Sequence, residues 1–189
     1  MARGLHPTDQ PNLVLIGYRA TGKTAVGARL AQILGRPFVD LDQLLVREAG
    51  KSIMEIVAKG GWAEFRRREK ELAARFRGTE GQVLATGGGV VLDPDNIAAL
   101  KENGIIIWLT ADPETIQARL TLDQPRDANR PSLTGDDTIR EVAAVLKERY
   151  TLYQAAADIT VDTTRRNVTQ VVDAVLAAAK LKEAEDLGG

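Results

Sequence analysis

Short apolar runs alternate along the chain with stretches in which apolar residues recur every three or four positions. Five of these runs are short and apolar enough to predict buried strands. They occupy residues 12–16, 36–40, 82–86, 104–109 and 157–161. The stretches between them have the period of helices with one face turned to a core. Strands that alternate with helices favour an α/β domain with a parallel sheet.

The first predicted strand runs directly into Gly-Tyr-Arg-Ala-Thr-Gly-Lys-Thr at residues 17–24. This stretch fits the phosphate-binding pattern G-x-x-x-x-G-K-[ST] at every fixed position, and an amphipathic helix follows it. Backbone N–H groups of such a loop, together with the positive end of the helix, can hold a phosphate chain. In this pattern Lys23 reaches the β- and γ-phosphates, and the Thr24 hydroxyl ligates Mg²⁺.

The second predicted strand ends in two carboxylates, Asp40 and Asp42. Because side chains alternate along an extended chain, we expect both carboxylates on the same side. Capping of the helix that follows is a competing interpretation for Asp42. A capping box at residues 52–55 then starts a short helix, which we expect to end at residues 60–61, where two glycines follow each other.

A carboxylate interrupts the apolar stripe of the next predicted helix, residues 62–76. The apolar members of the stripe are Trp62, Phe65, Leu72 and Phe76. Glu69 holds the remaining position, and an unpaired buried carboxylate is costly. We therefore expect Arg66 to pair with Glu69 and to keep its other donors for a ligand. A solvated basic face is the alternative, and it is the interpretation we favour for Arg67 and Arg68.

Two further features suggest a ligand site. The third predicted strand runs into Gly87, Gly88 and Gly89, which predict a backbone lying close against another group; a flexible loop is the alternative. Arg149 replaces an apolar residue on the stripe of a helix predicted from about residue 136 to 153, although a structural arginine that snorkels past the core would fit as well. Strand ends of a parallel sheet meet at one edge, so the loop segments should converge there.

Residues 121–135 show no periodicity and contain Arg126 and Arg130. A loop of this length inside a compact domain is usually functional or disordered. We interpret it as a lid that brings positive charge over bound phosphates.

Composition narrows the choice of partners. The 189 residues, 44% of them hydrophobic, suit one domain, with a core of about residues 12–180 and polar ends at 1–10 and 182–189. A net charge of −1 gives no general positive field for nucleic acid or an anionic membrane. No apolar run approaches the roughly 18 residues of a membrane span, and residues 1–10 contain no apolar signal region, so we expect a cytoplasmic protein. The absence of cysteine excludes a thiolate metal site or nucleophile.

Together these motifs resemble the shikimate kinase family. The resemblance rests on residues 17–24, 39–42, 65–67, 86–89, 130–131 and 148–153 and extends over about residues 13–176. It implies a P-loop NTPase fold like that of nucleoside monophosphate kinases: a three-layer α/β/α sandwich whose five-stranded parallel sheet has the order 2-3-1-4-5. It also implies a monomer with a mobile lid. The implied reaction is ATP-dependent phosphorylation of the 3-hydroxyl of shikimate, in the pathway to chorismate and the aromatic amino acids.

The resemblance also implies roles for individual residues. Shikimate binding falls to Asp42, Arg66, Gly87, Gly88, Gly89 and Arg149. ATP binding falls to Gly17, Ala20, Thr21, Gly22, Lys23, Thr24, Ala25, Arg119, Arg130 and Arg166. Mg²⁺ is expected beside Thr24 and Asp40. Many family members have glycine in place of Ala20, and here we expect a change in loop stiffness without loss of activity.

The implied chemistry agrees with the inward-facing arginines. A planar guanidinium pairs with a carboxylate in bidentate fashion, as binding of shikimate requires. Catalysis of phosphoryl transfer is mostly alignment and charge neutralisation, here by Mg²⁺, Lys23 and Arg130. Asp42 would accept hydrogen bonds from the acceptor hydroxyls, and whether it also takes the proton is left open.

Two other functions share part of this pattern. A kinase for gluconate or a nucleoside monophosphate would have the P-loop and the lid, but it would not need Asp42, Arg66 and Arg149 together. A non-catalytic nucleotide-binding module would not need acceptor residues at all. ATP turnover that depends on shikimate would separate the three.

Overall fold

The computed structural model describes residues 10–122 and 141–188 of the chain. Its five strands form one parallel sheet in the order β2-β3-β1-β4-β5, which confirms the predicted class and strand order. The strands are β1 (Asn12–Ile16), β2 (Phe38–Asp40), β3 (Val83–Ala85), β4 (Gly104–Thr110) and β5 (Ile159–Asp162). Each differs from its predicted range by at most two residues at either end.

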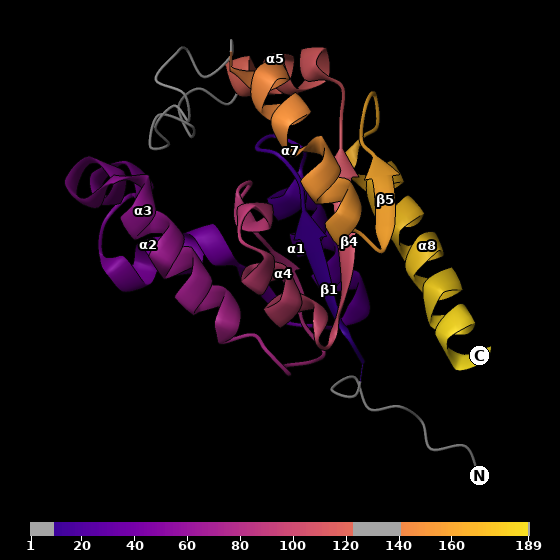
Figure 1. Ribbon diagram of the computed structural model, residues 1–189. Helices are drawn as coiled ribbons and strands as arrows, with labels where there is room; N and C mark the ends of the chain where they lie inside the picture. The colour runs from indigo at the N-terminus through magenta and orange to yellow at the C-terminus, as the bar shows by residue number, and fades with distance from the viewer. Residues whose placement is uncertain (1–9, 123–140, 189) are drawn as a thin grey trace.

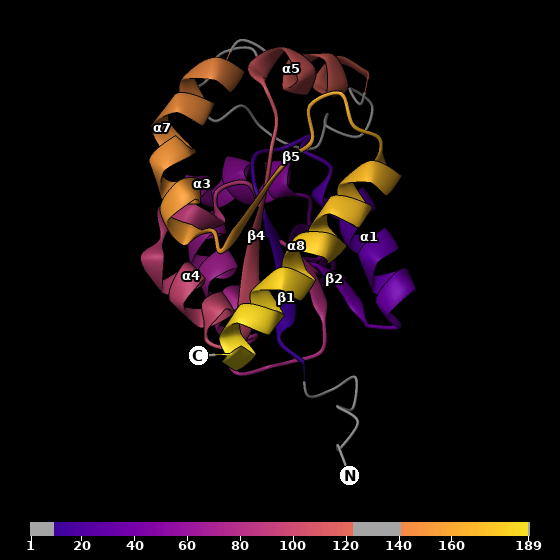
Figure 2. The same cartoon turned by 90° about the vertical axis from the view of Figure 1, so that its right-hand side faces the viewer.

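Helices cover both faces of the sheet (Figures 1 and 2). On one face, α1 (Lys23–Leu34) and α8 (Val168–Gly188) pack together over β1, β4 and β5. The other face is covered by α2 (Leu41–Ala49), α3 (Ile53–Ala74), α4 (Pro94–Lys101) and α7 (Val142–Ala156). A third apolar cluster joins α5 (Pro113–Leu122) to α7 beside the end of β1.

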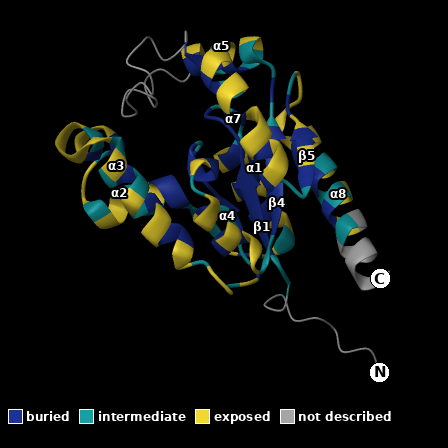
Figure 3. Cartoon of the chain, viewed as in Figure 1, coloured by how far each residue is buried: buried dark blue, intermediate teal, exposed yellow. Residues whose placement is uncertain are grey.

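The central strands account for the most deeply buried part of the core, shown in dark blue in Figure 3. Val14, Leu15 and Ile16 in β1 and Ile106 and Ile107 in β4 have no exposed surface. Burial of each such side chain contributes about 1.5–3 kcal/mol relative to exposure. The loops at the carboxyl ends of these strands are therefore attached to the most strongly packed part of the molecule.

The region after β2 corrects one prediction. Asp40 ends the strand and caps α2, since its side chain accepts a hydrogen bond from the Gln43 amide. Asp42 lies in the first turn of α2, so the expectation that an extended chain puts both carboxylates on the same side was wrong. The capping role weighed for Asp42 belongs to Asp40.

The boundaries of three helices also differ from those predicted. Ser52 and Glu55 form the expected capping box, and α3 is interrupted at Gly61, whose backbone angles of φ 71° and ψ 177° are not helical.

Two later helices run further than predicted. Thr121 and Leu122, predicted to begin the aperiodic loop, complete α5. The final helix continues to Gly188 and so includes most of the predicted polar end at residues 182–189. The rest of the predicted lid, with Arg126 and Arg130, lies outside the described residues.

Candidate active site

The loop between β1 and α1 has the backbone that a phosphate-binding loop requires. Gly17 has φ 138°, and a Cβ there would lie 2.2 Å from the Leu109 carbonyl oxygen, so only glycine fits. Gly22, with φ 96°, precedes the first turn of α1. Ala20 has φ 59°, in the left-handed region that alanine seldom adopts. This conformation indicates local backbone strain at Ala20, while the expected change in loop stiffness stays a prediction.

Polar contacts hold this loop in shape. The Lys23 ammonium group donates to the carbonyl oxygens of Gly17 and Tyr18, both at 2.7 Å. Thr21 donates its hydroxyl hydrogen to the Tyr18 carbonyl at 2.8 Å. From the other side, Arg119 in α5 donates to the carbonyl of Ala20 at 3.2 Å. The positive charge that a nucleotide would meet is thus fixed in position by the loop itself.

Thr24 and Asp40 come together at the start of α1. The Thr24 hydroxyl donates to Oδ2 of Asp40 at 2.7 Å. Both groups offer oxygen ligands, and Mg²⁺ is usually held by one or two carboxylates together with substrate phosphates and water. The pair therefore fits the predicted metal site in its chemistry and in its place beside the phosphate-binding loop.

The three consecutive glycines follow β3, next to the same loop. A Cβ on Gly87 would lie 2.7 Å from Oδ1 of Asp42 and 2.7 Å from Oε1 of Glu69, and one on Gly89 would overlap the Arg66 guanidinium. The predicted close approach of the backbone is confirmed at these two positions. A Cβ on Gly88, by contrast, would meet only ordinary contacts, the nearest being the backbone nitrogen of Arg19 at 3.4 Å.

Arg66 pairs with Glu69 as the helix pattern predicted, with Nη1 and Oε2 2.5 Å apart. Its guanidinium also lies over the rings of Trp62 and Phe65, 5.4 and 5.1 Å from their centroids. Burial raises the pKa of the Glu69 carboxyl, and the nearby Asp42 charge raises it further, while Arg66 opposes the shift. The Glu69 carboxylate thus holds Arg66 in place, and its removal from water costs free energy.

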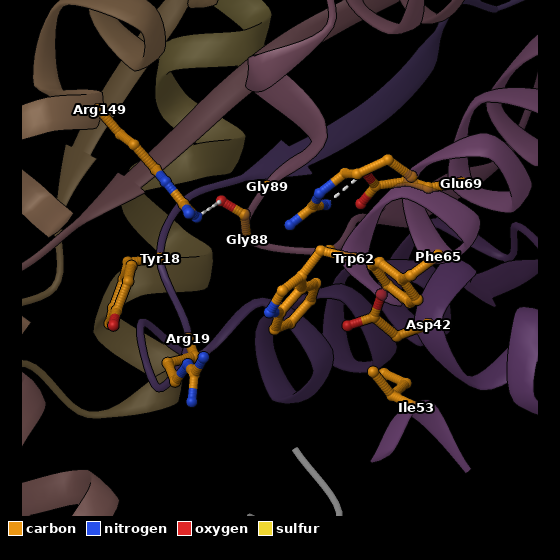
Figure 4. A pocket seen from close by; sticks show the side chains of 12 residues that line it. Tyr18, Arg19, Asp42, Ile53, Trp62, Phe65, Glu69, Gly88, Gly89 and Arg149 are labelled. Carbon is orange, nitrogen blue, oxygen red and sulfur yellow. Dashed lines mark hydrogen bonds and ion pairs between the residues drawn. The ribbon is translucent and has the colours of Figure 1, made fainter. Parts of the chain in front are cut away.

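Arg149 reaches the pocket from the opposite wall. It is only 6% exposed, and its Nη1 donates to the Gly88 carbonyl oxygen at 3.1 Å (Figure 4). The Tyr153 hydroxyl, one turn further along α7, donates to the same carbonyl. The side chain is therefore not a snorkelling arginine that carries its charge to bulk water. Its buried Nε has no hydrogen-bond partner in the part of the chain that the structure describes.

One pocket gathers these groups, and its described lining is mixed in charge. Asp42, Arg66, Glu69, Arg149 and residues 87–89 all line it. Figure 4 shows Arg149 on one side and Trp62, Glu69 and Asp42 on the other. An acid with hydroxyl groups would find guanidinium donors for its carboxylate and a buried carboxylate acceptor for its hydroxyls.

The remaining predicted nucleotide residues are placed less centrally. Arg119 also donates to the hydroxyl and carbonyl oxygens of Thr163, so it joins the phosphate-binding loop to the loop after β5. Arg166 is exposed on that second loop. Ala25 is exposed in the first turn of α1. Arg130 lies outside the described residues.

Sequence reasoning missed two pocket residues contributed by the phosphate-binding loop itself, Tyr18 and Arg19. Both occupy variable positions of the motif, where the pattern accepts any residue type. The only available signal was the arginine in a loop otherwise composed mainly of small residues.

A nucleotide-type phosphate loop at the carboxyl edge of the sheet, beside a separate pocket for a small acid, defines a P-loop small-molecule kinase. The sequence model of the shikimate kinase family matches residues 19–180. The chain belongs to the shikimate kinase family.

Individual relatives agree with this assignment. Shikimate kinase from Syntrophus aciditrophicus is 43% identical over 89% of this chain and 90% of its own length. Shikimate kinase from Symbiobacterium thermophilum is 42% identical over 94% of this chain and 99% of its own length. A solved shikimate kinase from Acinetobacter baumannii, in complex with shikimate, superposes with a TM-score of 0.84 at 33% identity and covers 92% of this chain and 94% of its own.

Proposed function

We propose that this shikimate kinase transfers the γ-phosphoryl group of ATP to the 3-hydroxyl of shikimate, as one kinase domain. The observation that carries the proposal is the pocket beside the phosphate-binding loop, where Arg66 and Arg149 approach from different helices and Asp42 lines the wall next to Gly87. A switch or scaffold that only binds nucleotide has no use for such a pocket.

Each wall of the pocket has a separate task. Arg66, held by Glu69, and Arg149, held by the Gly88 carbonyl, would clamp the shikimate carboxylate between them. Asp42 would accept hydrogen bonds from the ring hydroxyls and so turn the 3-hydroxyl toward the phosphates. This fixes the acceptor before transfer, which is where most of the catalytic advantage of a kinase arises.

The donor side relies on charge and orientation. Lys23 would neutralise the β- and γ-phosphate oxygens, and the N–H groups at the start of α1 would bind the rest of the phosphate chain. Thr24 and Asp40 would hold Mg²⁺, which supplies further charge neutralisation when bound. Arg130 is proposed for the same task from the segment after α5. We also propose a monomeric state and a cytoplasmic location. Separately, none of the helices in the described ranges is long and apolar enough to span a membrane.

ADP release measured by a coupled assay tests the proposal directly. We expect turnover with shikimate, and none above background with gluconate or nucleoside monophosphates. Chelation of Mg²⁺ should abolish turnover while shikimate binding, measured calorimetrically, persists. Equal turnover with gluconate, or nucleotide binding without any acceptor-dependent turnover, would contradict the assignment.

A further inference from the structure

A buried ion pair joins the phosphate-binding loop to α7. Arg19 is 7% exposed, and its Nη2 lies 3.5 Å from Oε1 of Glu141, whose side chain is completely buried. Its other terminal nitrogen, Nη1, is buried and has no hydrogen-bond partner among residues 10–122 and 141–188. Burial of two charges costs desolvation, and replacement of such a pair by apolar residues is often neutral or stabilising. Stability alone therefore gives no reason for this pair.

The pair closes a ring of contacts around the two halves of the site. Glu141 immediately precedes α7, and Arg149, two turns further along that helix, donates to the Gly88 carbonyl. Gly88 itself lies close to the phosphate-binding loop, since a Cβ on it would be 3.4 Å from the backbone nitrogen of Arg19. The phosphate-binding loop, the glycine turn and α7 are thus each connected to the other two.

Within this ring, the Arg19 side chain is a charged link between the loop and the start of α7, in a region where Tyr18 of the loop and Val142 of α7 also share an apolar cluster. Because the ion pair is directional, it fixes the distance between loop and helix more narrowly than apolar packing does, while Arg149 and Tyr153 tie α7 to the glycine turn. Figure 4 shows Arg19 below Arg149 in the pocket, with the Gly88 turn between the two sides. The separation of donor phosphates from the acceptor carboxylate depends on that distance.

We propose that the Arg19–Glu141 ion pair is a positioning contact that aligns the phosphate-binding loop with Arg149, and thereby aligns the 3-hydroxyl with the γ-phosphate. The inference rests on the proposed function. In this role Arg19 acts through Glu141 and α7. Each substrate can still bind in its own part of the site when the pair is lost, whereas transfer between the two is impaired because misplacement by about 1 Å can reduce rates roughly 100-fold.

The test removes both charges at once, in R19M/E141L, so that no unpaired buried charge remains. We expect kcat to fall at least about tenfold, KM for ATP and for shikimate to stay within about threefold, and thermal stability to be equal or higher. R19K, which keeps the positive charge, should recover part of the lost kcat. The matched control is R75M/E48L, which removes an exposed Arg–Glu pair between α3 and α2 and should leave kcat unchanged.

Each outcome decides the question. Unchanged kcat in R19M/E141L would overturn the inference, and so would a rise of tenfold or more in either KM at constant kcat, which would make Arg19 a direct ligand. E141Q retains the shape of the side chain; if the double variant does not fold, a normal kcat in E141Q overturns the inference equally.

A parent protein inactive on shikimate would overturn the proposed function itself, whereas an active parent with an unaffected variant overturns only the positioning role.

Discussion

Lys23 brings an ammonium group into the centre of the phosphate-binding loop, where two backbone carbonyls orient it. Its side chain contributes charge at a fixed point and little apolar packing. The same loop contains Ala20 in a left-handed conformation, so one residue serves the chemistry and another carries backbone strain. Both effects can be separated by single substitutions.

Lys23→Ala should lower kcat at least about 100-fold, because a preorganised charge on the transferring phosphate is lost. The fold should survive, since the strands and apolar clusters do not depend on this side chain. Steady-state kinetics and circular dichroism measure the two effects, with Lys180→Ala on the exposed face of α8 as the control. A folded variant with near-normal turnover would refute the role of Lys23.

Ala20→Gly should stabilise the protein by about 0.5–1 kcal/mol, because glycine adopts φ 59° without the steric cost that alanine meets there. Activity should change little. Denaturant unfolding measures the free energy, and Ala174→Gly within α8 is the matched control, expected to destabilise by about 1 kcal/mol. A loss of stability in Ala20→Gly would mean that the strain has been misjudged.

At the scale of elements, the acceptor pocket is made by two helices on the same face of the sheet. Each presents one guanidinium inward and fixes it differently: α3 uses a carboxylate on its own surface, and α7 uses a carbonyl of the glycine turn. Because the two anchors differ, each arginine is tested by a variant of its own.

Arg149→Leu should weaken shikimate binding by roughly 2–5 kcal/mol, the range for truncating one partner of a desolvated charge pair. Its effect on folding should be neutral or stabilising, because leucine continues the apolar stripe of α7. ATP affinity should change by less than about twofold. Calorimetric titration with each substrate beside thermal unfolding makes the measurement.

The corresponding change in α3 is Arg66→Leu combined with Glu69→Met, so that no buried carboxylate is left unpaired. The same loss of shikimate affinity is expected, again with ATP binding retained. Shikimate binding within about twofold of the parent in both helix variants would leave the substrate carboxylate without its assigned partners.

At the scale of the whole molecule, the sheet order brings the two halves of the site together. β1 ends in the phosphate-binding loop, and its neighbour β3 ends in the glycine turn. Residues 17 and 88 are therefore adjacent, with a Cβ on Gly88 only 3.6 Å from the Gly17 carbonyl oxygen. The acceptor pocket is built on the same rigid edge as the donor site.

Shikimate alone should therefore stabilise the protein against unfolding, since the described walls of its pocket are already assembled. At a concentration 100 times its dissociation constant, we expect a gain of about 2.7 kcal/mol. Denaturant titrations with and without shikimate, in the absence of nucleotide, provide the measurement. Stabilisation that appears only after ATP is added would mean that the nucleotide completes the pocket and that its walls are not assembled beforehand.

Local patterns predicted much of this arrangement. The strand order followed from the family resemblance, and the Arg66–Glu69 pair followed from helix spacing because both residues lie on one turn. Asp42 was misplaced because the change from strand to helix at Leu41 leaves no clear mark in a short acidic stretch. The Arg19–Glu141 pair could not be foreseen, since its partners are more than a hundred residues apart and no local rule couples them.

The interruption of α3 at Gly61 divides the lining of the pocket between two pieces of chain. Ile53 belongs to the piece before the break, whereas Trp62, Arg66 and Glu69 belong to the piece after it. One apolar side chain of the lining, Ile53, is thus encoded apart from the guanidinium groups that recognise the acid's carboxylate. A change at Ile53 can therefore widen or narrow the pocket for a bulkier acid while both guanidinium groups stay where they are, so the size of the acceptor can be selected separately from its charge.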